Sequence, residues 1–297
     1  MSYNVIFLGN NEATLKSLLK CNVKIIAAIY EFNHDLVHTG GYDHIIKEKG
    51  GVVVGIPKDN KKELIKTVNC FHRPDLFLIS YFTILPRELL SYPQKIINIH
   101  PSLLPQYKGA HPIQWALINS EKQIGVTFMT IKETVDEGEI YCQFPINIEQ
   151  EDNQLTLFEK TNEVVDLHLC KIIAQVLKSE IVAKPQSGCG SYFPKLNKSN
   201  RYINFKKMTA SDIHNLNRSQ VKYGGVITTF KQIRIELPIS KVINNENQED
   251  SPSIIKELYT INNNQYCITV QCITGQIQFI SNNMIFDKIK VGDCLGT

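Results

Sequence analysis

The chain has 297 residues, of which 43% are hydrophobic and 21% charged, an ordinary composition for a soluble globular protein of one large or two smaller domains. Its formal net charge of +3 falls short of the concentrated basic surface that is typical of nucleic-acid-binding proteins. No apolar run approaches the roughly 20 residues of a membrane-spanning helix, and no signal peptide is visible, so we expect a cytoplasmic protein with no nucleic-acid and no membrane partner.

In the first half of the chain, short apolar runs alternate with helical patterns. Strands are expected at 4–8, 23–30, 52–54, 74–79, 96–100 and 124–131, and helices at 12–19, 44–49, 58–69, 112–119 and 156–178. The last helix is expected to open with a capping box, Thr156-Leu-Phe-Glu159. This alternation predicts an α/β fold with a doubly wound, Rossmann-like sheet. The single glycine after the first strand is far from a dinucleotide fingerprint, so no nicotinamide cofactor is expected.

The second half differs in composition and pattern. A Pro-, Ser- and Gly-containing segment near 184–190 predicts a linker. Beyond it, period-2 alternation and Asn or Gly turns predict a small β-rich domain, with strands at 202–205, 226–230, 233–237, 258–261, 267–270 and 276–280, a helix at 211–218 and an exposed loop at 243–253. We therefore expect a catalytic domain at 1–185, a linker at 186–200 and a C-terminal domain at 201–297.

Eight cysteines raise the question of disulfides or a zinc site. No two of them form a C-x-x-C pair, and Cys267 and Cys272 lack a matching His or Cys couple at zinc spacing. Several lie inside apolar runs, where cysteine behaves as a small hydrophobe. We expect reduced thiols and no metal.

An amide and an imidazole, Asn98 and His100, stand two residues apart at the end of the buried strand 96–100. In an extended strand they point to the same face, and Pro101 ends the strand. Open α/β sheets bind their ligands at this end of the parallel strands. Taken alone, however, Asn-x-His is more often a strand that ends in a core histidine, because short motifs match by chance.

The longer string Asn98-Ile-His-Pro-Ser-Leu-Leu-Pro-Gln-Tyr-Lys-Gly109 resembles the signature of the N10-formyltetrahydrofolate-dependent formyltransferases. In that family an Asp in a Val-Asp-x-Gly turn follows, and the match here is Val135-Asp136-Glu137-Gly138. Asp136 alone would be an ordinary turn residue before glycine. The resemblance covers most of residues 1–185 and continues more weakly to about 235. It implies N10-formyltetrahydrofolate as formyl donor and Asn98, His100 and Asp136 as catalytic residues.

These residue types suit transfer of a formyl group to an amine. An amide NH₂ donates to the oxyanion of a tetrahedral intermediate without gaining charge. A neutral imidazole accepts the amine proton. A carboxylate beside the imidazole raises its proton affinity and orients groups or a bound water. None of these steps requires a metal.

The resemblance also implies residues that bind the two substrates. Those expected to contact the folate are Tyr81, Phe82, Thr83, Ile84, Leu85, Ser102, Leu104 and Val135. Those expected to contact the acceptor are Asn10, Lys108, Arg218 and Tyr223. Lys108 is equally consistent with a solvated loop lysine, and Tyr223 with a strand-packing residue rather than a base-stacking one.

The arrangement resembles both methionyl-tRNA formyltransferases and sugar N-formyltransferases. Pro101 favours the sugar class, because tRNA-formylating members typically carry Ala or Gly there. The segment 202–225 resembles the corresponding sugar-modifying segment, and the C-terminal domain lacks the basic surface that a polyanion requires. We expect formylation of a nucleotide-linked, dTDP-type amino-dideoxy sugar, for lipopolysaccharide O-antigen biosynthesis, by a homodimer. The alternatives are a methionyl-tRNA formyltransferase or a formyltetrahydrofolate hydrolase with water as nucleophile.

Overall fold

The computed structural model describes residues 2–32, 43–244, 251–262 and 265–296. They divide into two compact units. The first holds residues 1–109, 124–147 and 159–192, and the second holds 110–123, 148–158 and 193–297. Each unit is thus assembled from three separate stretches of the chain. Much of the predicted loop at 243–253 lies outside the described residues.

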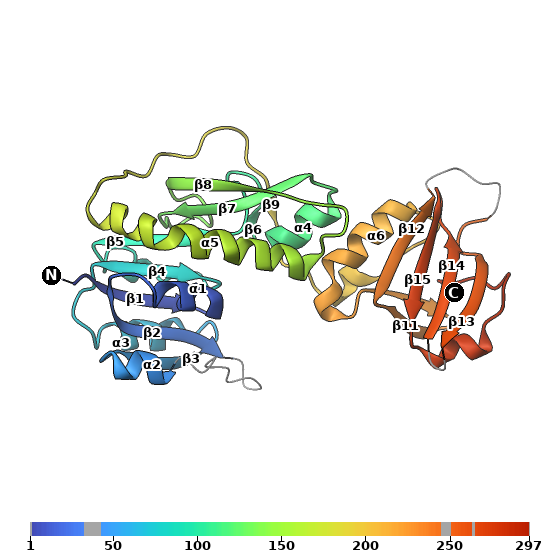
Figure 1. Ribbon diagram of the computed structural model, residues 1–297, viewed down its shortest axis with the longest axis horizontal. Coiled ribbons are helices and arrows are strands. Elements are labelled where there is room, and N and C mark those ends of the chain that lie inside the picture. Colours follow the sequence, from blue (N-terminus) through green and yellow to red (C-terminus); the bar gives the residue numbers. More distant parts are fainter. Residues whose placement is uncertain (1, 33–42, 245–250, 263–264, 297) are drawn as a thin grey trace. The chain divides into compact units, whose positions relative to one another are not determined.

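The first unit is built on a seven-stranded sheet with the order β3-β2-β1-β4-β5-β7-β8 (Figure 1). The strands β1 to β5 pair in parallel, and β7 pairs antiparallel with β5. The fold is therefore α/β with a central parallel sheet, as predicted. The bounds are β1 Asn4–Gly9, β2 Lys24–Phe32, β3 Val52–Pro57, β4 Leu76–Ser80, β5 Lys95–His100, β7 Gln123–Met129 and β8 Ile140–Asn147.

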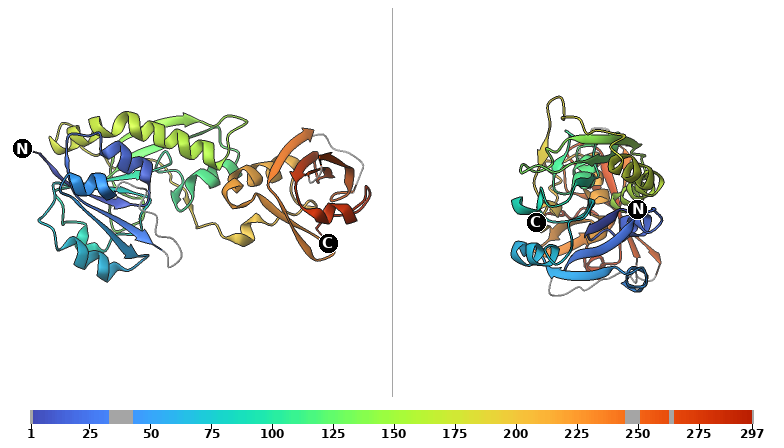
Figure 2. Two further views of the ribbon diagram at one scale, coloured as in Figure 1. Left: turned by 60° about the horizontal axis from the view of Figure 1, so that its bottom comes forward. Right: turned by 90° about the vertical axis from the view of Figure 1, so that its left-hand side faces the viewer.

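Helices cover this sheet. Leu64 and Val68 of α3 belong to one apolar cluster with Ile6 and Leu8 of β1. Helix α1 runs alongside α5 (Figures 1 and 2). The Ser17 hydroxyl donates to Asp166 Oδ1 at 2.6 Å. The bounds are α1 Glu12–Leu18, α2 Asp43–Glu48, α3 Lys61–Val68, α5 Gln154–Leu177 and the 3₁₀ turn η1 Arg87–Leu89. Within the described ranges, no helix is both long and apolar enough to cross a membrane.

The start of α5 corrects the predicted capping box. The helix begins at Gln154, and the carboxamide of Asn153 accepts from the backbone N–H groups of Leu155 and Thr156 at 2.8 and 3.4 Å. The Thr156 hydroxyl accepts in return from the N–H of Asn153 at 2.9 Å. Asn153 is therefore the N-cap, because its side chain satisfies free N–H groups of the first turn, and Thr156 lies inside the helix.

The cysteines also differ from the prediction. Cys21, just after α1, and Cys170 in α5 form a disulfide. They are 149 residues apart in the sequence, so no local spacing could pair them. The other cysteines are outside any disulfide, and burial raises the pKa of Cys142 to about 11 and of Cys272 to about 12. Among the described residues, no group of three or more His, Cys, Asp or Glu side chains is placed to hold a metal.

The second unit contains an antiparallel four-stranded sheet with the order β12-β15-β14-β13 and a hairpin of β10 and β11. Ile213 and Leu216 of α6 share an apolar cluster with Val270 and Phe279 of the sheet. The β-rich C-terminal region is therefore confirmed. The strand bounds are β10 Val226–Phe230, β11 Ile233–Leu237, β12 Ile239–Asn244, β13 Ile255–Asn262, β14 Gln265–Gln271 and β15 Gln276–Ser281.

Two helices and several 3₁₀ turns complete this unit. They are α4 Pro112–Ile118, α6 Ala210–Ser219, η2 Lys198–Arg201, η3 Val221–Tyr223 and η4 Met284–Lys288. The capping box of α6 is formed by Thr209 and Asp212. The strand predicted at 202–205 is wrong, since only Tyr202 forms an isolated bridge, with Ile227. The apolar alternation there reflects Ile203 and Phe205, which are buried in the core.

Candidate active site

The strand β5 carries Asn98 and His100 at its C-terminal end. On one side it pairs in parallel with β4, and on the other antiparallel with β7, where His100 lies opposite Thr127. Asn98 is half-buried and His100 is buried. Because alternate residues of a strand share a face, the amide and the imidazole lie on the same side of the sheet.

The hydrogen bonds of His100 fix which ring nitrogen carries a proton. Nε2 lies 2.9 Å from the carbonyl oxygen of Tyr107. A carbonyl can only accept, so Nε2 carries the hydrogen, and in the neutral ring Nδ1 holds the lone pair. Nδ1 is 3.7 Å from Asp136 Oδ1, too far for a hydrogen bond. The basic nitrogen of His100 therefore faces a carboxylate without being bonded to it.

Asp136 occupies a constrained turn. Its φ is +54°, and its Oδ2 accepts from the backbone N–H of Gly109 at 2.8 Å. At Gly138 an added Cβ would lie 1.8 Å from the carbonyl oxygen of Thr130, so only glycine fits. This requirement explains the glycine of the Val-Asp-x-Gly turn. The structure thus brings His100 and Asp136 together, with Asn98 on the same strand.

The segment Tyr81–Leu85 follows β4 directly and presents an uneven surface. Tyr81, at φ +55°, is 43% exposed, and Ile84 is 57% exposed. The Thr83 hydroxyl donates to Asp59 Oδ1 at 2.5 Å, and Phe82 packs against the core of the sheet. Leu85 is buried. Tyr81 and Ile84 are therefore the members of this segment with the most surface to offer a ligand.

The other residues predicted to contact the folate lie in two loops. Ser102 and Leu104 are buried, and the Ser102 hydroxyl donates to the carbonyl of Gln106 at 2.7 Å. Val135 is half-buried. The side chains of Ser102 and Leu104 thus support the loop after β5 from within.

Two residues predicted to bind the acceptor have partners inside the first unit. The Asn10 carboxamide accepts from the N–H of Glu31 at 2.9 Å and donates to its carbonyl at 2.7 Å, which ties the ends of β1 and β2 together. The Lys108 ammonium lies 3.0 Å from Glu137 Oε1. Lys108 therefore connects the loop after β5 to the turn that carries Asp136.

The remaining two lie in the second unit. The Arg218 guanidinium donates to the carbonyls of Asp152 and Glu149 at 3.0 and 3.3 Å, and to Asn215 Oδ1 at 2.9 Å. Burial lowers the pKa of Arg218. Tyr223 is 47% exposed. Arg218 thus anchors the segment before α5, whereas the Tyr223 ring has open surface.

Sequence reasoning missed the residues that hold the loop after β5. The Thr127 hydroxyl donates to the carbonyl of Ser102 at 2.6 Å and accepts from the N–H of Leu104 at 3.3 Å and from Gln143 at 2.9 Å. Gln143 also donates to the carbonyl of Leu104 at 2.8 Å. The sequence signal that could have identified them is Thr127, a polar residue inside the apolar strand predicted at 124–131.

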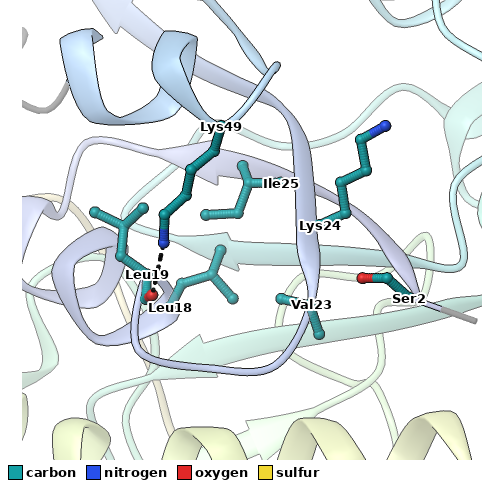
Figure 3. A pocket seen from close by; sticks show the side chains of 7 residues that line it. All are labelled: Ser2, Leu18, Leu19, Val23, Lys24, Ile25 and Lys49. Atoms are coloured by element: carbon teal, nitrogen blue, oxygen red, sulfur yellow. Dashed lines mark hydrogen bonds between the residues drawn. The ribbon is translucent and has the colours of Figure 1, made fainter.

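A separate cavity of about 220 Å³ lies near the N-terminal end of β2 in the first sheet (Figure 3). Its lining is formed by Ser2, Leu18, Leu19, Val23, Lys24, Ile25 and Lys49. It adjoins the start of β2, whereas His100 ends β5, and the two strands run in the same direction within the sheet. This cavity is therefore not part of the His100 site.

Comparison with known proteins identifies the family. The formyl transferase family matches residues 44–177, and its C-terminal domain matches residues 195–284. The methionyl-tRNA formyltransferase of Thermodesulfovibrio yellowstonii is 34% identical over 252 residues, or 82% of each chain. That of Sulfurihydrogenibium sp. is 30% identical over 250 residues, or 80% of each chain.

Solved structures share the fold. An N-formyltransferase from Helicobacter canadensis, in complex with folinic acid and dTDP-3-aminofucose, aligns with a TM-score of 0.67 and 21% identity over 94% of this chain and 98% of that one. HypX from Aquifex aeolicus, in complex with tetrahydrofolic acid, aligns with a TM-score of 0.67 and 14% identity. This chain spans 44% of HypX. On the evidence of the sequence relatives, the chain belongs to the formyl transferase family.

Proposed function

We propose that this protein transfers the formyl group of N10-formyltetrahydrofolate to the amine of a nucleotide-linked amino sugar, with Asn98, His100 and Asp136 as catalytic residues. One observation carries the catalytic part. His100 is held by the Tyr107 carbonyl with its lone pair on Nδ1, and that nitrogen faces a nearby carboxylate. A base prepared in this way is what an amine nucleophile requires.

The chemistry follows from these positions. The amine nitrogen attacks the formyl carbon, and the Asn98 amide donates to the developing oxyanion. The amine proton passes to Nδ1 of His100, and Asp136 stabilises the resulting imidazolium. Collapse of the intermediate breaks the bond between the formyl carbon and N10, and N10 takes the proton. The products are a formamide and tetrahydrofolate.

The end of β4 suits the folate donor. Tyr81 and Ile84 expose apolar surface next to the strand that carries Asn98 and His100. Such surface favours a flat aromatic ring, and backbone groups of a loop can provide polar contacts to it. The folate-bound structures of the same fold support a folate as the formyl donor.

The choice of a sugar acceptor rests on charge. Residues 201–297 contain eleven basic and eight acidic side chains. Arg201 and Arg234 both pair with Glu236, and Arg218 donates to backbone carbonyls. These three arginines are engaged within the unit, but seven of the eight lysines in 201–297 are exposed. The argument against a polyanion is therefore the small net charge, because the acidic side chains offset most of the basic ones. The dTDP-sugar complex of the similar fold supports the same choice.

A methionyl-tRNA acceptor is the second candidate. It is favoured by the two curated relatives that are 34% and 30% identical over most of the chain. In that case the charge of the second unit would have to suffice for tRNA, and affinity would fall steeply with salt. A cytoplasmic location, a homodimer and a role in cell-surface polysaccharide synthesis stay predictions.

The test is a comparison of kcat/KM for dTDP-linked amino sugars and for charged initiator tRNA in one buffer at one salt concentration. We expect efficient formylation of a sugar and poor formylation of the tRNA. The sugar assignment is wrong if the tRNA is formylated at least as efficiently. Release of formate without a formylated acceptor would indicate the hydrolase. Asp136→Asn protein serves as the inactive control.

A further inference from the structure

The segment 184–191, which follows α5, is hydrogen-bonded to both loops of the active site. At its start, Lys184 exchanges two backbone hydrogen bonds with Ile140, of 2.8 and 2.9 Å. At its end, Ser191 contacts the loop that follows β5, where the short strands β6 Lys108–Gly109 and β9 Tyr192–Phe193 pair. We call residues 184–191 the strap, because hydrogen bonds join this segment to the loops on both sides of His100. It lies where the sequence predicted a linker.

Gln186 is the strap's contact with the catalytic turn. Its Nε2 donates to the carbonyl oxygens of Asp136 and Gly138 at 2.7 and 2.9 Å. Because carbonyls only accept, the NH₂ group must face the turn. Its Oε1 is buried and has no hydrogen-bond partner among the residues that the structure describes. An orphaned acceptor of this kind disfavours burial of the side chain, so it is the contact with the turn that accounts for the position of Gln186.

Ser191 contacts Tyr107, the residue whose carbonyl oxygen accepts from Nε2 of His100. Its hydroxyl accepts from the N–H of Tyr107 at 2.9 Å, and its own N–H donates to the carbonyl of Pro105 at 3.1 Å. Its carbonyl accepts from the N–H of Lys108 at 2.8 Å. The strap therefore holds the residue whose carbonyl fixes Nε2 of His100, as well as the residue whose carboxylate faces Nδ1.

We propose that Gln186 and Ser191 are positioning residues for the formyl transfer, which set the distance from Asp136 to His100 and the orientation of the His100 ring. Both Tyr107 and Asp136 have positive φ, at +58° and +54°. Such conformations persist only where the surroundings impose them. The strap supplies that constraint on both sides of the imidazole at once. This inference rests on the proposed function, since it supposes that His100 and Asp136 act together.

The main test is Gln186→Met, which keeps the length of the side chain and removes its donor. We expect kcat to fall about 10-fold or more, with the KM for both substrates changed less than threefold, because the change acts on an interaction made in the transition state. The matched control is Gln94→Met. Gln94 donates to Asp75 Oδ1 at 2.8 Å and lies before the start of β5, at the far end of that strand from His100.

A double-mutant cycle separates positioning from general stability. In an Asp136→Ala background, Gln186→Met should have no further effect on kcat, because the carboxylate that it positions is gone. An equal loss of kcat in both backgrounds would overturn the proposal. The smaller change Ser191→Ala leaves its backbone hydrogen bonds intact and should lower kcat by a few-fold, again without raising KM.

The outcomes also separate this inference from the proposed function. Full activity of Asp136→Ala would refute the catalytic role on which both depend. A dead Asp136→Ala with a fully active Gln186→Met would refute the positioning role alone. Thermal unfolding of each variant is measured alongside. A Gln186→Met protein that loses kcat only in proportion to its folded fraction would also refute it.

Discussion

The loops around His100 and the sheet of the second unit are stabilised in different ways. Around His100, backbone and side-chain hydrogen bonds fix residues of positive φ, including Tyr107 and Asp136. In the second unit, α6 and the four-stranded sheet enclose a continuous apolar cluster that includes Phe279 and Val270. Polar geometry therefore determines the site, and apolar burial determines the stability of the second unit. Substitutions around His100 should therefore lower kcat, and substitutions in the apolar cluster should lower the free energy of unfolding.

The largest effect on stability is expected in the apolar cluster. Phe279 is fully buried, and Phe279→Ala should lower the free energy of unfolding by about 3–5 kcal/mol through lost burial and a cavity. The single tryptophan, Trp115, lies in the second unit, so its fluorescence in urea follows that unit. Tyr259→Ala, at a residue 53% exposed on the same sheet, should cost under about 0.5 kcal/mol. A Phe279→Ala protein that is fully folded but has lost its kcat would contradict this assignment of stability to the second unit and of activity to the loops around His100.

The next effect concerns the site itself. His100→Ala should lower kcat about 100-fold or more, because it removes the base that we propose accepts the amine proton. The double variant with Asp136→Ala should lose little beyond that, since the two residues act as a unit. The midpoint of unfolding should change far less than in Phe279→Ala. Full activity of His100→Ala under conditions where chemistry limits the rate would remove His100 from the mechanism.

Much of the fold and of the candidate site can be predicted from the sequence, because the motifs and the apolar periodicity are local patterns. The Asn98-to-Gly109 string and the Val-Asp-x-Gly turn located the residues that we propose as catalytic, and the alternation at 226–237 predicted both strands of the hairpin. The contacts across long separations could not be predicted. Nothing in the sequence pairs Cys21 with Cys170, and nothing shows that Gln186 reaches the turn at Asp136, because such contacts depend on the tertiary packing of α5 and the strap.

Two glycines test how strictly the catalytic turn is built. In Gly138→Ala the new methyl would meet the Thr130 carbonyl at 1.8 Å, so the backbone of the turn must shift. We expect a loss of about 1–3 kcal/mol of stability and a kcat reduced in step with the displaced Asp136. The control is Gly50→Ala, which lies after α2 and outside the strap, where φ is +79° and no heavy atom of another described residue, apart from the two chain neighbours, lies within 4 Å of the added Cβ. That variant should show only the cost of the backbone conformation, about 1 kcal/mol, and a nearly normal kcat. Equal kcat values for the two variants would show that the turn tolerates movement.

The smallest effect is a pH dependence of the second unit. His214, in α6, lies 2.9 Å from the Ser240 hydroxyl through Nδ1. Burial, and then the charge of Arg218, lowers its pKa below the ordinary value of 6.5, against a smaller opposing influence from Glu151. Between the folded and unfolded pKa values the unfolded chain binds more protons, so acidification favours unfolding.

The contribution of His214 to stability is thus fully present above about pH 6.5 and declines as the pH falls from there to the folded-state pKa. His214→Gln should flatten the dependence of the free energy of unfolding on pH between 5 and 7.5, measured in urea by Trp115 fluorescence. His72→Gln, at an exposed residue of the first unit, should leave it unchanged. Because His214 contributes to stability and not to proton transfer, kcat of His214→Gln at pH 7.5 should equal that of the unaltered protein. An unchanged slope in His214→Gln would place the acid sensitivity of the second unit in another group.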